Sequence, residues 1–276
     1  LQSTGSFKVR GAALKLSRMT PEERARGVVT ASAGNHGQGV ALAASRLGIP
    51  AAVVVPTICP QVKREGMTRY GAEVIVEGAS YDEAHERALA LAKARYVPYV
   101  SAYDDDDIIA GNGEWLGREI AKQHVGLSRV IVPVGGGGLV AGLLRALPGV
   151  AVNGVQPRVN CAMHDSLAVG RALVEYRGGE TICEGLEGAT AQRTYDIARA
   201  HNLAIALVEE EDTLEAVGFA WRALGLVIEP SAAVGVAAAR AGLVPTDEDT
   251  VIVVTGGNVD PALLDRAIDR YDTRRR

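Results

Sequence analysis

A lysine near the start of the chain, Lys8, follows a turn rich in glycine and serine and precedes the first apolar residues of a predicted helix. The turn comprises residues 3–7, and the apolar residues begin at Ala12. The first turn of a helix leaves backbone N–H groups free and carries the positive end of the helix dipole. An amine held there suits a lysine that forms a Schiff base with a carbonyl group. An exposed lysine after a flexible turn is the alternative.

Four successive glycines, residues 135–138, follow a predicted strand and open a predicted helix. Without side chains they can direct N–H groups inward, and the helix start adds positive potential, so a phosphate is the natural ligand. The same residues fit the pattern G-x-G-x-x-A of a dinucleotide site. That pattern requires an acidic residue at the end of the next strand, and Gln156 stands there. The dinucleotide hypothesis therefore takes second place.

Two further turns also join a strand to the segment after it. Residues 32–37 combine free N–H groups with a hydroxyl, an amide and an imidazole, which could bind a small carboxylate. The alternative is that Ser32 only caps the helix and His36 bonds locally. Residues 255–258 form the other turn. Ligands of open α/β sheets collect at the carboxyl ends of strands, so these turns favour one shared site.

The segments between these turns alternate between strand-like and helix-like patterns, which predicts parallel sheets covered on both faces. In the aspartate run at residues 104–107 we expect a solvated loop, with Asp107 as the cap of the next helix. The predicted strands are residues 27–30, 51–55, 73–76, 99–101, 129–134, 150–155, 206–208 and 250–254.

The composition excludes several classes of protein. A length of 276 residues predicts one large or two intertwined domains. The net charge of −4 gives no reason to expect nucleic acid or an anionic membrane as a partner. The longest apolar runs are only as long as strands, so we expect no membrane span. Three widely separated cysteines form no C-x-x-C pair, which fits a reducing compartment.

Five motifs occur in the order found in threonine/serine dehydratases, and the resemblance covers essentially the whole chain. Those enzymes are tryptophan-synthase-β-like, fold-type II pyridoxal-phosphate enzymes. The resemblance implies the short, catabolic form, without the usual N-terminal segment or a C-terminal regulatory domain. The motifs are residues 5–11, 31–38, 133–139, 229–231 and 255–258.

The resemblance also implies an architecture. We expect an α/β protein of two domains, each a mostly parallel twisted sheet flanked by helices, with the cofactor in the cleft between them. Residues 1–22 and 107–276 would form the large cofactor-binding domain. Residues 23–106 would form a small mobile substrate-binding domain.

Carried over residue by residue, the resemblance makes Lys8 the catalytic Schiff-base lysine. Asn35 would bond the ring hydroxyl of pyridoxal 5'-phosphate, and Thr255 would face its pyridine nitrogen, where the family usually has Ser or Cys. The implied cofactor-binding residues are Phe7, Lys8, Asn35, Gly135, Gly136, Gly137, Gly138, Leu139, Glu229 and Thr255. The implied substrate-binding residues are Ser32, Ala33, Gly34, Asn35 and His36.

The implied activity is that of a lyase of amino-acid catabolism, which converts L-threonine or L-serine to a 2-oxo acid and ammonia. We expect a cytoplasmic homodimer or homotetramer. The alternatives are an amino-acid racemase, another β-eliminating lyase, or a non-covalent dinucleotide- or amino-acid-binding module. Racemases of the family have a serine where this chain has Ala33, which favours dehydration. We expect no metal, because relatives with an ion site have carboxylates at the positions of Gln156 and Ala162.

Overall fold

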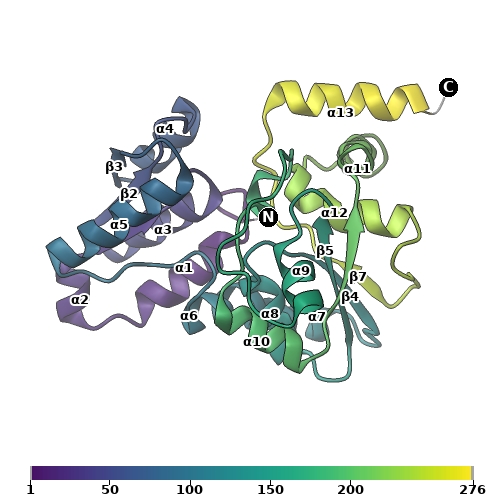
Figure 1. Ribbon diagram of the computed structural model, residues 1–276, viewed down its shortest axis with the longest axis horizontal. Coiled ribbons are helices and arrows are strands. Elements are labelled where there is room, and N and C mark those ends of the chain that lie inside the picture. Colours follow the sequence, from purple (N-terminus) through teal and green to yellow (C-terminus); the bar gives the residue numbers. More distant parts are fainter. Residues whose placement is uncertain (1, 275–276) are drawn as a thin grey trace. The chain divides into compact units, whose positions relative to one another are not determined.

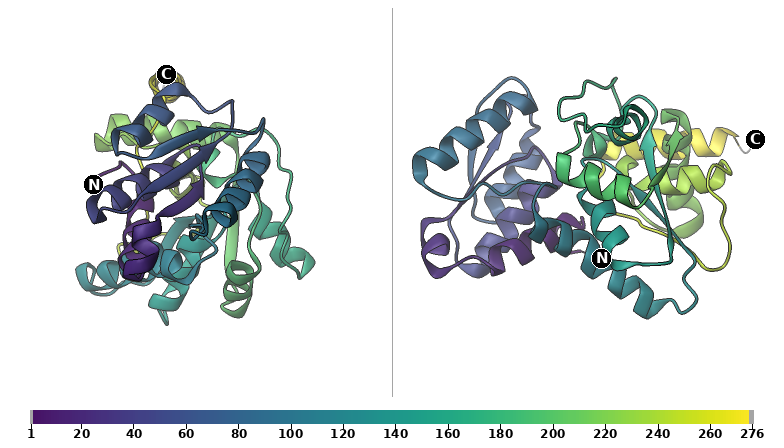
Figure 2. Two further views of the ribbon diagram at one scale, coloured as in Figure 1. Left: turned by 90° about the vertical axis from the view of Figure 1, so that its left-hand side faces the viewer. Right: turned by 60° about the horizontal axis from the view of Figure 1, so that its bottom comes forward.

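The computed structural model describes residues 2–274. Their contacts divide the chain into two compact units, with the boundary between Asn112 and Gly113. Each unit has its own parallel sheet (Figures 1 and 2). Among residues 2–274, no helix combines the length and the apolar character that crossing a membrane requires. The predicted fold class, sheets of parallel strands flanked by helices in two units, is confirmed.

The first unit contains a three-stranded sheet in the order β1-β2-β3. Its strands are β1 (Val28–Ala31), β2 (Ala51–Val55) and β3 (Glu73–Val76). The predicted strand at residues 99–101 is reduced to a single parallel bridge between Tyr99 and Val29. The helices are α1 (Lys8–Ser17), α2 (Pro21–Arg26), α3 (Asn35–Leu47), α4 (Gln61–Arg69), α5 (Tyr81–Arg95) and α6 (Asp106–Ile109).

Both faces of this sheet are buried. On β2, Ala52 and Val54 pack in a cluster with alanines of α5, whereas Val53 and Val55 pack with residues of α3 and α4. Figure 1 shows α5 lying across the sheet. Side chains of a strand alternate between the two faces, so a continuous apolar run predicts a strand that is covered on both sides.

Close packing of α1 on α3 fixes the first turn of α1. A Cβ atom on Gly39 of α3 would lie only 3.0 Å from the backbone nitrogen of Val9 and 3.1 Å from the carbonyl carbon of Lys8. The N–H of Gly11 donates to the side-chain oxygen of Asn112 at 2.9 Å. A Cβ on Gly11 would approach that side chain to 2.7 Å. Two glycines and a buried asparagine therefore position the backbone of Lys8.

The aspartate run begins α6, and its capping residue is Asp105. One carboxylate oxygen of Asp105 accepts from the N–H groups of Asp107 at 2.9 Å and Ile108 at 3.1 Å. The other oxygen lies 2.6 Å from the Lys15 amine on α1. The prediction of Asp107 as the cap was wrong, because α6 begins at Asp106 and Asp107 lies inside its first turn. The run is therefore anchored to α1.

The second unit contains a four-stranded parallel sheet in the order β6-β5-β4-β7. Its strands are β4 (Arg129–Pro133), β5 (Ala151–Pro157), β6 (Ala204–Val208) and β7 (Thr250–Ile252). A π-helical segment (Ala110–Glu114) precedes the first α-helix of this unit, and a 3₁₀ turn (Glu184–Leu186) follows α9. The α-helices are α7 (Trp115–Gln123), α8 (Gly138–Ala146), α9 (Ala162–Val169), α10 (Gln192–Ala200), α11 (Glu210–Leu224), α12 (Pro230–Arg240) and α13 (Pro261–Arg274).

Helix α12 forms the centre of this unit. Its residues from Pro230 to Ala238 are all buried, and they pack against β4, β5, β6 and α11. Helix α13 lies beside α11 in Figures 1 and 2. Helices α10 and α13 were not predicted from the sequence. The alanine-rich sequence of α12 allows the sheet and the helix to approach closely, which holds the turns at their ends in place.

The predicted domain division joined residues 1–22 to residues 107–276. In the structure, α1 packs on α3 and α6 within the first unit. The predicted division is a statement about which segments move together as one body, whereas the two units are defined by contacts. It therefore stays a prediction.

The close packing of α1 on α3 leads to a prediction about the free energy of unfolding. Gly39→Ala should lower the free energy of unfolding by about 1–3 kcal/mol, because the added methyl meets backbone atoms that cannot move independently. Gly66→Ala in α4 is the matched control, since its Cβ would meet only the end of the flexible Gln38 side chain at 3.3 Å. That change should be neutral or stabilise by up to about 1 kcal/mol. Urea unfolding measures both, and equal effects would contradict the close packing.

Candidate active site

Lys8 is the first residue of α1. Its amine donates to the carbonyl oxygen of Ala102 at 3.1 Å and lies 5.3 Å from the centre of the Phe7 ring. The preceding turn has a positive φ of 71° at Gly5, a conformation that favours glycine. The predicted arrangement, a lysine held between a glycine turn and a helix start, is therefore present.

The turn after β1 lies at the carboxyl edge of the first sheet. Helix α3 begins at Asn35, and its N-cap is Gly34, without a capping side chain. The Ser32 hydroxyl accepts instead from the Gly34 N–H at 3.2 Å. The alternative in which Ser32 caps the helix is thus wrong, because its hydroxyl closes the turn one residue before the helix. The first N–H groups of α3 have no acceptor within their own helix.

His36 is buried in the first turn of α3, with 3% of its surface exposed. Its Nε2 lies 3.1 Å from the Val100 carbonyl oxygen, so Nε2 carries the proton. Burial, reinforced by the positive charge of Lys8, lowers the pKa of His36 to about 3. Its Nδ1 is buried and has no hydrogen-bond partner among the described residues. His36 is therefore a neutral imidazole with an unused acceptor.

Ala33 lies between Ser32 and Gly34 in this turn. It packs partly against the apolar cluster that contains Cys59 and Met67. Its methyl group can neither donate nor accept a proton. The structure thus brings Ala33 and His36 to one turn and the Lys8 charge close to the His36 ring.

Neighbouring residues pack closely against the four-glycine loop of the second unit. Gly137 has a positive φ of 92°, and a Cβ there would lie 2.6 Å from the Met163 methyl carbon and 2.8 Å from the Thr194 Cβ. A Cβ on Gly135 would lie 3.2 Å from the Gly185 carbonyl oxygen. Helix α8 begins at Gly138 without a capping side chain. The loop forms a cradle in which Gly137 is required, because a side chain there would be strained and crowded.

A buried threonine holds this loop in place. The hydroxyl of Thr194, on α10, donates to the Gly136 carbonyl oxygen at 2.7 Å. This bond fixes the conformation of the loop, and the first N–H groups of α8, which have no acceptor within their own helix, suit an anion. Thr194 could not be predicted from the sequence, because nothing near it marks α10 as a partner of the loop.

The remaining predicted residues of this unit lie on turns that contact one another. The Glu229 N–H donates to the Gly256 carbonyl at 3.0 Å, beside the buried Thr255. The Ser231 hydroxyl accepts from the Gly185 N–H at 2.9 Å, and Gly185 forms the wall beside Gly135. The structure therefore brings the starts of α8 and α12 and the turn after β7 to one edge of the second sheet.

These features fit a phosphorylated cofactor. The glycine cradle has backbone donors and a helix start, and its neighbours Met163, Thr194 and Gly185 are uncharged, which suits a phosphate. Leu139, next in α8, is buried behind it. The Thr255 hydroxyl, on the turn after β7, is buried at the same edge of the second sheet.

The two positions discussed for a hard cation carry no carboxylate. The Gln156 side-chain oxygen accepts from the His164 N–H at 2.9 Å, and Ala162 is buried. The prediction that magnesium and calcium are not needed stays a prediction.

Comparisons with known proteins identify the family. Residues 1–256 match the family of pyridoxal-phosphate dependent enzymes. The chain is 40% identical over 275 residues to L-threonine ammonia-lyase of Thermotoga maritima, covering 98% of this chain and 68% of that protein.

Solved structures agree in fold. The processed form of threonine deaminase isoform 2 from Solanum lycopersicum has a TM-score of 0.90 at 32% identity, covering 98% of this chain and 80% of that one. Serine racemase from Dictyostelium discoideum has a TM-score of 0.86 at 31% identity, covering 94% and 85%. The match to most of the chain, with the lysine turn and the glycine cradle in place, shows that this protein belongs to the family of pyridoxal-phosphate dependent enzymes.

Proposed function

We propose that the protein removes water and ammonia from L-threonine or L-serine and yields the 2-oxo acid. The observation that carries this proposal is the position of Lys8, whose amine is held at the carboxyl edge of the first sheet by the Ala102 carbonyl. The relatives named as threonine ammonia-lyase and threonine deaminase support the substrate class. We also propose a cytoplasmic homo-oligomer, as the resemblance implies.

We propose that both units supply residues to the cofactor. Lys8 would bind its aldehyde, with Phe7 beside the ring and Asn35 at the ring hydroxyl. The cradle of residues 135–139 would hold the phosphate, and Thr255 would face the pyridine nitrogen near Glu229. When bound, pyridoxal phosphate withdraws electrons from the substrate's Cα atom, which makes its proton acidic.

The chain's own groups account for the remaining chemistry. The Lys8 amine is the base that takes the proton from Cα. The start of α3, beside Ser32 and Gly34, would bind the substrate carboxylate, because the helix dipole is positive there. His36 is neutral, so its side chain adds no positive charge for that carboxylate. Its Nδ1 carries no proton and can only accept a hydrogen bond. The Thr255 hydroxyl is uncharged, so it would not hold the pyridine nitrogen protonated.

A racemase is the second candidate, because serine racemase from Dictyostelium discoideum shares the fold at 31% identity. Racemisation needs a second acid or base within about 3 Å of Cα, on the face opposite Lys8. The family resemblance places Ala33 there, and a methyl group cannot supply a proton. The family match also favours covalent chemistry over the non-covalent binding module.

The reaction should be mainly dehydration. With L-serine, the holoenzyme should form pyruvate and little D-serine, as measured by chiral chromatography, and L-threonine should yield 2-oxobutanoate. Ala33→Ser should raise the D-serine share. Lys8→Ala serves as the inactive control and should lose at least about 100-fold in rate. D-serine formation as fast as pyruvate formation in the unaltered enzyme would contradict the dehydratase proposal.

The buried His36 predicts a dependence of stability on pH. Its folded pKa of about 3 lies below the unfolded value of 6.5, so below pH 6.5 the unfolded state binds a proton that the folded state does not. The free energy of unfolding should therefore fall by about 1.4 kcal/mol per pH unit between pH 6.5 and about 3. From pH 7 to pH 5 this amounts to about 2 kcal/mol.

Urea unfolding at the two pH values tests this. His36→Gln keeps an amide donor toward Val100 but cannot titrate, so its stability should change by about 2 kcal/mol less than that of the unaltered protein. His201→Gln, at the exposed end of α10, is the control and should behave like the unaltered protein. Equal pH dependence in all three proteins would show that His36 is not held neutral.

A further inference from the structure

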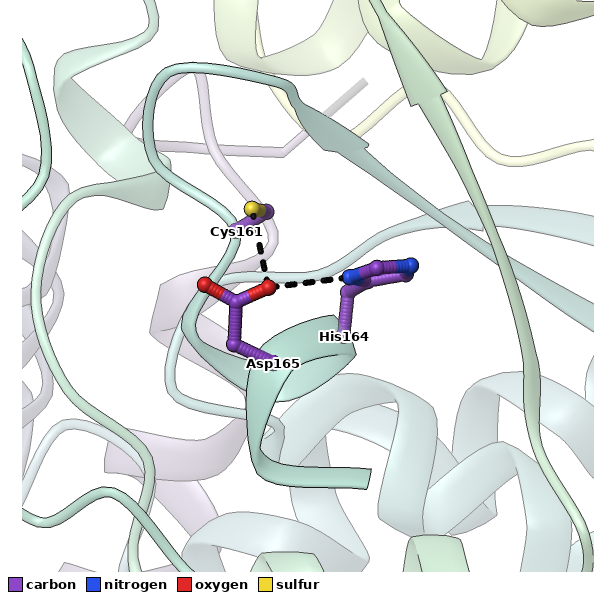
Figure 3. A group of neighbouring side chains, drawn as sticks. All are labelled: Cys161, His164 and Asp165. Carbon is purple, nitrogen blue, oxygen red and sulfur yellow. Dashed lines mark hydrogen bonds and ion pairs between the residues drawn. The ribbon is translucent and has the colours of Figure 1, made fainter. Parts of the chain in front are cut away.

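A cluster of three potential metal ligands lies at the start of α9, in the second unit. Cys161 is the residue before the helix, and His164 and Asp165 lie in its first turn. One ligand atom from each lies within 4.8 Å of the others. Figure 3 shows the Cys161 sulfur and the His164 ring both directed at the Asp165 carboxylate. We propose that these three residues bind a transition-metal cation of the Zn²⁺ class.

The ligand atoms are about as close together as those around a tetrahedral ion. The Cys161 sulfur lies 3.6 Å from Oδ1 of Asp165, and Nδ1 of His164 lies 3.0 Å from the same oxygen. With bonds of about 2.3 Å to sulfur and 2.0–2.2 Å to nitrogen and oxygen, the ligand atoms of tetrahedral Zn²⁺ are about 3.4–3.6 Å apart. Small rotations of the partly exposed His164 side chain would lengthen the shorter distance toward that range.

The ligand types select the metal. A thiolate, an imidazole and one carboxylate suit Zn²⁺ or Co²⁺, whereas Mg²⁺ and Ca²⁺ need more oxygen ligands. On binding, the Cys161 thiol loses its proton to solvent and His164 keeps its proton on Nε2. This site differs from the position of Gln156 and Ala162, which the sequence analysis considered for a hard cation.

The surroundings also resemble those of a metal site. The Tyr176 hydroxyl donates to the other carboxylate oxygen of Asp165 at 2.9 Å, which turns Oδ1 toward the cysteine and the histidine. Such partners behind a ligand fix its orientation. Cys161 is buried, whereas the His164 and Asp165 side chains are 41% and 39% exposed. The exposed side leaves room for a water molecule as the fourth ligand.

The site is placed to support the glycine cradle. Met163 lies between Cys161 and His164 in the sequence and is fully buried. Its methyl carbon is the atom that a Cβ on Gly137 would meet. An ion that ties the first turn of α9 together would also hold Met163 against the cradle, which suggests a structural role.

Cobalt binding tests the proposal directly. The holoenzyme, treated with a chelator and then dialysed, is titrated with Co²⁺ alone while the visible bands of tetrahedral cobalt are recorded in the red, away from the cofactor's absorbance. One equivalent of Co²⁺ should produce these bands, and Zn²⁺ should abolish them whereas Mg²⁺ should not. Zn²⁺ should also raise the melting temperature.

Variants assign the ligands. Cys161→Ser and His164→Asn should each weaken Co²⁺ binding by more than about 100-fold, and Tyr176→Phe by about 10–100-fold, as for a partner behind a ligand. Cys59→Ser, which removes a buried cysteine of the first unit, should bind Co²⁺ normally. If Cys161→Ser does not fold, His164→Asn still tests the proposal, because the half-exposed His164 side chain can be replaced without disturbing the core. Absence of the bands in the unaltered protein, or their persistence in His164→Asn, would overturn the proposal.

Discussion

Two neighbouring backbone carbonyls, those of Val100 and Ala102, accept hydrogen bonds from three polar side chains of the first unit. The Val100 oxygen accepts from the Thr30 hydroxyl at 2.8 Å and from Nε2 of His36 at 3.1 Å, and the Ala102 oxygen accepts from the Lys8 amine. Because Val100 follows the bridge between Tyr99 and β1, its position is set by the sheet. One short segment thus fixes the lysine's location and the tautomer of the histidine.

Small residues play the corresponding role in packing. Gly39 lets α3 approach the backbone of Lys8, and Gly137 lets the cradle approach Met163 and Thr194. A methyl group on Gly39 would crowd the backbone of Lys8 and Val9, and one on Gly137 would crowd Met163 and Thr194. The chemistry proposed here therefore rests on close backbone contacts that glycines allow, and these contacts position the side chains that do chemistry.

Much of this could be predicted from the sequence, because continuous apolar runs and glycine turns report on local structure. Strand β2 was predicted with its observed bounds, and Lys8 was placed at the start of a helix. Contacts between distant segments leave no such signal. Asn112 caps the first turn of α1 from a hundred residues away, and Thr194 holds the cradle from a helix that was not predicted.

The cluster on α9 was missed for a different reason. Cys161, His164 and Asp165 are close in sequence, but their spacing matches no common zinc motif. Only the start of a helix at Ala162 places the three side chains on one side. The capping prediction failed similarly: four identical residues offer no local signal to choose between Asp105 and Asp107.

The most direct measurement is to locate the covalent link to the cofactor. The holoenzyme is reduced with borohydride, which makes a Schiff base permanent, and its peptides are examined by mass spectrometry. The structure and the family resemblance together predict a pyridoxyl group on Lys8 alone, and none on Lys15, Lys63, Lys93 or Lys122. A label on any of those lysines in place of Lys8, or no label on a protein that binds pyridoxal phosphate, would contradict the proposed active site.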